Sequence, residues 1–136
     1  MNEYQKLIAK LKVTREDMRT LHHHLVGPNW FGTHEVLGEY YAKFDDIADH
    51  IVEIGLSQGI TDVPIDEAVQ AFPLLPIEDR NEAESYSLAQ QIFLDVDSLM
   101  QDVIDAIEDG WVISMLNNYQ EWLHLEADYK MARATK

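Results

Sequence analysis

Four long stretches of the sequence carry apolar residues at the three- and four-residue spacing of an amphipathic α-helix. In the first stretch, Tyr4, Leu7, Ile8 and Leu11 repeat at this spacing. No strand pattern or internal repeat interrupts the helical periodicity, so the sequence predicts an all-α fold. The expected helices cover residues 3–26, the chain after Gly27-Pro28-Asn29 up to about Ser57-Gln58-Gly59, residues 81–108, and the chain from about Trp111 onward.

The connections between these helices narrow the fold further. The link between the second and third helices is the longest, at residues 60–76, and Pro64 followed by Asp66 and Glu67 predicts a short helix inside it. Four helices with one long crossover have the connectivity of a ferritin-like four-helix bundle. We therefore expect one ferritin-like domain over residues 1–136. A generic helical bundle without metal is the alternative that the pattern alone leaves open.

The composition limits which metal ligands the chain can offer, and its hydropathy bears on its cellular compartment. The chain of 136 residues has no cysteine, which excludes disulfides and thiolate metal sites. Any metal must then be held by nitrogen and oxygen ligands. No apolar run approaches the roughly 18 residues of a membrane span, and the N-terminus has no signal-peptide pattern. These features predict a cytoplasmic protein without a membrane partner.

The net charge of −15 is unevenly distributed. Residues 1–20 hold five basic and three acidic side chains, so the acidic excess lies in the rest of the chain. Such a surface repels nucleic acid and attracts cations such as Fe(II). A surface that serves only solubility is the alternative reading.

One motif of bundle-core di-iron proteins is present, but it is incomplete. Such sites need two Glu-x-x-His motifs and two further glutamates. This chain has a single copy, Glu121-Trp122-Leu123-His124. We therefore expect no metal site inside the bundle, and expect Glu121 and His124 to be surface or packing residues.

A second set of potential ligands lies between residues 21 and 59. His22 is late on the first helix and His34 early on the second, while Asp49 and Glu53 are four residues apart and so share a helix face. His34 and Asp49 are separated by about 22 Å of helix, too far to bind one ion within a chain. Two antiparallel copies related by a two-fold axis could join them, giving two equivalent sites per dimer. Alternatively, Asp49 and Glu53 form only a solvated face.

The same residues carry a family resemblance. The sequence resembles the Dps miniferritins, in which a Leu-His pair precedes an aromatic residue and a glycine-rich turn leads into Phe-x-x-His. In that family an aspartate follows this histidine by 15 residues and a glutamate follows four later. The tryptophan of the last helix is also similar. The matching residues are Leu21-His22, Gly27-Pro28-Asn29-Trp30-Phe31, His34-Glu35, Tyr41, Asp49, Glu53, and Trp122 with Leu123 and Leu125.

The resemblance implies a hollow homo-oligomer, a dodecamer built from two-fold dimers. It implies a ferroxidase that oxidises Fe(II) with peroxide or dioxygen, stores ferric iron and protects against oxidative damage. His22 and His34 would bind iron from one subunit, and Asp49 and Glu53 from its partner. This ligand set also accepts zinc or manganese.

Two positions depart from the family pattern. Gly38 stands where the family has a carboxylate four residues after the second histidine, and Glu39 is one place further, turned by about 100° around the helix. We expect weaker iron binding unless Gly38 loosens the helix enough for Glu39 to reach the site. His23 and His24 replace an aromatic and an asparagine-like residue, and are either extra ligands or exposed polar residues.

Three functions remain open from the sequence. The first is a working miniferritin. The second is a ferritin-like shell or dimer that has lost ferroxidase activity, which Gly38 suggests, and that serves as an acidic structural or interaction protein. The third is an acidic helical protein that binds basic partners and never binds metal. Direct DNA binding is not expected, because the sequence has no lysine-rich tail before the first helix.

Overall fold

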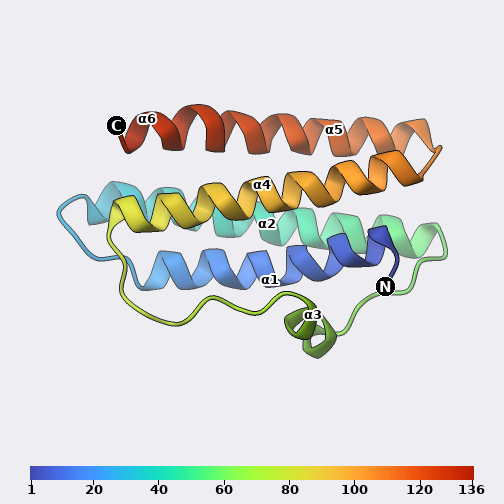
Figure 1. Ribbon diagram of the computed structural model, residues 1–136, viewed down its shortest axis with the longest axis horizontal. Coiled ribbons are helices and arrows are strands. Elements are labelled where there is room, and N and C mark those ends of the chain that lie inside the picture. The colour runs from blue at the N-terminus through green and yellow to red at the C-terminus, as the bar shows by residue number, and fades with distance from the viewer.

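The computed structural model describes all of residues 1–136 and contains no β-strand. Four long helices lie alongside one another, and the short helix α3 lies beside α1 at the edge of the bundle (Figure 1). This all-α four-helix arrangement with one long crossover confirms the predicted fold class. The elements are α1 (Glu3–His23), α2 (Trp30–Ser57), α3 (Ile65–Ala71), α4 (Glu82–Ala106), α5 (Gly110–His124), the π-helix η1 (Leu125–Met131) and α6 (Ala132–Ala134).

Local side-chain caps fix the starts of two long helices. The Asn2 side chain accepts a hydrogen bond from the Gln5 backbone N–H at 2.8 Å, and the Gln5 side chain accepts one from the Asn2 backbone N–H at 3.2 Å. Asn81 and Glu84 form the same reciprocal pair at the start of α4. These capping boxes satisfy backbone donors that have no partner inside the helix.

The core is built from the apolar stripes of all the long helices. Phe93 of α4 lies 5.1 Å from Phe44 of α2 and 5.3 Å from Trp122 of α5, measured between ring centroids. This aromatic cluster therefore joins three helices at the centre of the bundle. The largest fully buried side chains are Leu7, Ile8, Leu11, Met18, Leu21, Leu37, Phe44, Ile47, Ile51, Phe93, Met100 and Leu116.

Polar contacts hold the crossover against α1. The Lys12 ammonium donates to Asp62 at 2.9 Å and to the Val63 carbonyl at 2.6 Å, just before α3. Beyond α3, the Leu75 backbone N–H donates to buried Asp17 at 3.0 Å. Burial raises the pKa of Asp17, an effect partly offset by this hydrogen bond. The short helix predicted within the crossover is confirmed.

The end of the first helix differs from the prediction. Helix α1 stops at His23, three residues before the expected residue 26. The next residues pair with the segment leading into α4 instead: the Arg80 N–H donates to the His24 carbonyl, and the Val26 N–H donates to the Arg80 carbonyl. Gly27, with a φ of 126°, then reverses the chain into α2. The helix therefore ends earlier than the hydrophobic periodicity predicts, because the residues after it pair with a distant segment of the chain.

The C-terminal helix changes form at His124. This residue ends α5, and its Nε2 lies 3.0 Å from Asp97 of α4 while its Nδ1 lies 2.6 Å from Asp128 of η1. His124 thus links two helices at the surface, and Glu121 is exposed.

None of the helices combines the length and hydropathy that a bilayer crossing needs.

The contacts of His124 predict a pH-dependent contribution to stability. The hydrogen bond to Asp128 raises the pKa of His124, and Asp97 acts in the same direction. The stabilisation is then full below the ordinary imidazole pKa and is lost as pH rises through the folded-state pKa. Because the side chain is 46% exposed, we expect His124→Gln to cost only about 0.5–1 kcal/mol at about pH 5.5 and less at about pH 8.5. Urea unfolding at both pH values measures this difference, and an equal cost at both would contradict it.

Candidate metal centre

The turn between α1 and α2 brings His22 and His34 into direct contact. Their ring centroids are 3.8 Å apart and the rings are stacked, with an interplanar angle of 19°. His22 Nδ1 bonds to the His34 carbonyl at 2.8 Å, and His34 Nδ1 bonds to the His22 carbonyl at 2.9 Å. This reciprocal pair fixes both rings against the backbone of the opposite helix.

The hydrogen bonds also determine which ring nitrogens are free. A carbonyl oxygen can only accept, so each Nδ1 must carry the proton and donate. The Nε2 of each neutral ring then keeps a lone pair for a metal, an arrangement found for most histidine ligands. Burial lowers the pKa of His22, which favours the neutral form that a metal requires.

Trp30 provides a third ring at this end of the bundle. It stacks on His34 with centroids 4.1 Å apart and an interplanar angle of 15°. The neighbouring histidines are placed differently. His23 is exposed, with its ring 5.4 Å from that of His22, and His24 lies 3.6 Å from Asp79. Only His22 and His34 therefore form a fixed pair.

Asp49 and Glu53 lie further along α2. Both are exposed and line a surface hollow of about 260 Å³ together with Lys12 and Arg15. Lys12 is paired with Asp62, and Arg15 with Asp45. Neither Asp49 nor Glu53 forms an ion pair within the subunit. Both carboxylates are thus available to an external cation.

Glu39 does not join the histidine pair within the subunit. Helix α2 runs unbroken past Gly38, so the chain does not loosen there. Glu39 lines a different hollow, of about 280 Å³, with Tyr40, Tyr86 and Glu126. The residue that does lie beside the pair is Gly38, whose Cα faces the ring of His22.

The structure does not bring all the predicted ligands together in one subunit. No group of three or more His, Asp or Glu side chains in the chain has the arrangement of a metal site. His34 and Asp49 stand about 22 Å apart along one continuous helix. A site that uses both needs a second copy of the chain.

Comparison with solved structures shows the fold to be a known one. The antigen TpF1 of Treponema pallidum superposes with a TM-score of 0.90 and 16% identity, covering 98% of this chain and 89% of that one. A Dps protein of Bacillus brevis superposes with a TM-score of 0.89 and 20% identity, covering 98% of this chain and 93% of that one. Dps of Staphylococcus aureus superposes with a TM-score of 0.88 and 16% identity, and the two coverages are again 98% and 93%. The chain has a Dps-like, ferritin-like fold. No protein-family model and no curated protein matches the sequence.

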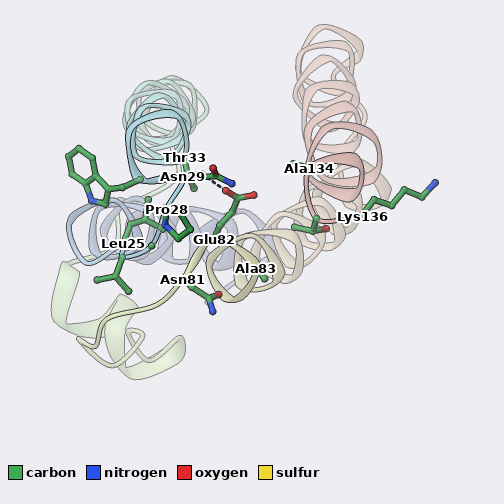
Figure 2. Close-up of a pocket in the computed structure, with 13 residues that line it drawn as sticks. Leu25, Pro28, Asn29, Thr33, Asn81, Glu82, Ala83, Ala134 and Lys136 are labelled. Carbon is green, nitrogen blue, oxygen red and sulfur yellow. Dashed lines mark hydrogen bonds between the residues drawn. The ribbon is translucent and has the colours of Figure 1, made fainter.

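A pocket at one end of this Dps-like bundle lies close to the histidine pair. It measures about 270 Å³ and lies between the α1–α2 turn, the start of α4 and the C-terminus (Figure 2). Thr33 donates to Glu82 at 2.8 Å, and Asn81 accepts from Glu84. Neither histidine of the pair lines this pocket.

The packing of two residues against the histidine rings was not predicted from the sequence. Trp30 precedes His34 by four residues, a spacing that places both on one face of α2 and could have indicated the stacking. Gly38 follows His34 by the same interval, but its contact with His22 comes from another helix. No local signal reveals such a contact.

Proposed function

We propose that the protein is a miniferritin that oxidises Fe(II) at sites shared between two subunits and stores ferric iron in a hollow shell. The observation that carries this proposal is the His22–His34 pair, in which both Nδ1 atoms are bonded to carbonyls and both Nε2 atoms are free. Asp49 and Glu53, which have no ion-pair partner of their own, complete the ligand set from a second subunit.

The donor set suits iron as the substrate. Two neutral imidazoles and two carboxylates provide the nitrogen and oxygen ligands that Fe(II) accepts, and zinc or manganese could compete for them. The histidine side holds the ion in a fixed direction, while the carboxylates offset its charge. Two Fe(II) ions together supply the two electrons that, with two protons from solvent, reduce one hydrogen peroxide to two waters, so no hydroxyl radical is released.

The assembly follows from the separation of the two half-sites. A two-fold axis that places the histidine end of one α2 against the carboxylate end of another creates two equal sites. We propose a cytoplasmic dodecamer of such dimers, which protects against oxidative damage. The net charge of −15 per subunit favours Fe(II) uptake and opposes direct DNA binding.

The function is tested by adding Fe(II) anaerobically and then peroxide or air, with ferric absorbance and particle mass measured on one sample. The wild type should oxidise iron faster than buffer and retain it in a particle of shell size. Asp49→Ala should lose at least about 90% of the initial rate, because an ionised ligand is removed. Asp46→Ala, an exposed aspartate on the same helix, is the matched control and should keep the wild-type rate.

One observation favours a second candidate function. Gly38 leaves the subunit's own half of the site without a carboxylate. A protein that forms the shell but oxidises iron no faster than buffer would be an acidic structural or interaction protein. In that case Asp49→Ala and Asp46→Ala would behave alike in the iron assay, and the particle mass would still be that of a shell.

A further inference from the structure

Gly38 lies directly against the ring of His22. A Cβ added to Gly38 would stand 2.8 Å from His22 Cε1, 3.1 Å from Nδ1 and 3.6 Å from Nε2. Real Cβ atoms essentially never approach another heavy atom within 3.0 Å, so any side chain at this position requires the ring to move. The ring of His22 occupies the space that a side chain at position 38 would take.

The ring has little freedom to move away. Its Nδ1 is bonded to the His34 carbonyl at 2.8 Å, and its face is stacked on the His34 ring at 3.8 Å. A shift that relieves a contact at position 38 must lengthen the hydrogen bond, separate the stack, or both. Lengthening the hydrogen bond exposes the Nδ1 proton to water, and either change alters the direction of the Nε2 lone pair.

We infer that Gly38 is a positioning residue. Because it has no side chain, the His22 ring can lie against it and keep its contacts with His34. This subunit's half-site then has two fixed imidazole nitrogens. The inference rests on the proposed function for the identity of the bound ion as a divalent metal. A half-site of imidazoles alone favours Fe(II), Co(II) or Zn(II) over Mg(II), Ca(II) or Mn(II), which prefer oxygen ligands.

This role reverses the expectation that the sequence raised for Gly38. Viewed as a missing carboxylate, the glycine would be improved by replacement with aspartate. If the glycine instead positions His22, the replacement weakens metal binding, because Gly38→Asp gains a carboxylate but displaces a fixed nitrogen ligand. The two interpretations predict opposite changes in metal affinity for the same substitution.

Gly32 provides a matched control on the same helix. A Cβ at Gly32 would meet no atom within 4 Å. Alanine is a better helix former than glycine, so Gly32→Ala and Gly38→Ala should both raise the helix propensity of α2. Only the second substitution brings an atom against His22.

The first measurement is made without metal. In NMR spectra of the histidine rings, the two Nδ1 protons bonded to carbonyls should exchange slowly with water in the wild type and in Gly32→Ala. In Gly38→Ala the His22 proton should exchange rapidly, while circular dichroism shows unchanged helix content. A slowly exchanging His22 proton in Gly38→Ala would overturn the positioning role.

The second measurement is calorimetric titration of the assembled protein with Co(II). Gly38→Ala should bind about 10–100-fold more weakly than Gly32→Ala, the range typical for loss of ligand orientation, and Gly38→Asp should also bind more weakly than the wild type. In a His22→Ala background, Gly38→Ala should cause no further loss, because its effect acts through His22. Tighter binding by Gly38→Asp, or additive losses, would overturn the inference.

The two measurements separate this inference from the proposed function. In one outcome, the His22 Nδ1 proton exchanges slowly in the wild type and rapidly in Gly38→Ala, but the wild type binds no Co(II). The positioning role then stands and the shared metal site is wrong. If Co(II) binds equally to the wild type, Gly32→Ala and Gly38→Ala, the metal site stands and the role of Gly38 is wrong.

Discussion

Replacing Phe93 with alanine is expected to lower the free energy of unfolding by about 3–5 kcal/mol. Phe93 is fully buried, and its ring lies 5.0 Å from Tyr40, 5.1 Å from Phe44 and 5.3 Å from Trp122. Truncation removes the apolar contacts of a whole aromatic side chain and leaves a cavity where α2, α4 and α5 meet. Urea denaturation followed by circular dichroism measures the loss.

Leu94→Ala is the control for this substitution. Leu94 follows Phe93 on α4 and is 41% exposed, so its truncation should cost no more than about 1 kcal/mol. Both variants must be compared at one protein concentration, since the apparent stability of an oligomer depends on concentration and the proposed function makes this protein one. Similar losses for Phe93→Ala and Leu94→Ala would contradict the assignment of the aromatic cluster as the centre of the core.

Most of the fold could be predicted because its signals are local. Hydrophobic periodicity located the long helices, and Pro64 with the acidic residues after it located α3 within the crossover. The capping pair of Asn81 and Glu84 marks the start of α4 within one residue of the predicted position.

The unpredicted features of the fold depend on distant contacts. The π-helix η1 follows α5 without a break, and the Ala127 carbonyl within it accepts a hydrogen bond at 3.0 Å from Gln90 of α4. The hydrophobic pattern of residues 125–131 does not distinguish this π-helix from an α-helix. The early end of α1 depends in the same way on pairing with Arg80, more than 50 residues away.

The site could be predicted only in outline. Spacing and family resemblance selected His22, His34, Asp49 and Glu53, and helix geometry required that the two pairs stay apart in one subunit. The structure places His22 and His34 in contact. The ring stacking, the protonated Nδ1 atoms and the space at Gly38 all involve two helices at once, so the sequence could not show them. The joining of both pairs at one metal remains a proposal.

The central claim is that each metal site takes its histidines from one subunit and its carboxylates from another. It predicts complementation between His34→Ala and Asp49→Ala, each of which should be inactive alone in Fe(II) oxidation. In a mixed dimer one site carries both substitutions and the other carries neither. Random co-assembly makes half of the dimers mixed, so about one quarter of the wild-type sites should be intact.

The decisive measurement is therefore the initial rate of Fe(II) oxidation by co-expressed His34→Ala and Asp49→Ala subunits. Co-expressed His34→Ala and His22→Ala subunits are the control, because both substitutions affect the histidine half and every site in a mixed dimer remains broken. The account predicts about a quarter of the wild-type rate for the first mixture and none above the parent variants for the second. A first mixture no faster than its inactive parents would contradict the shared site.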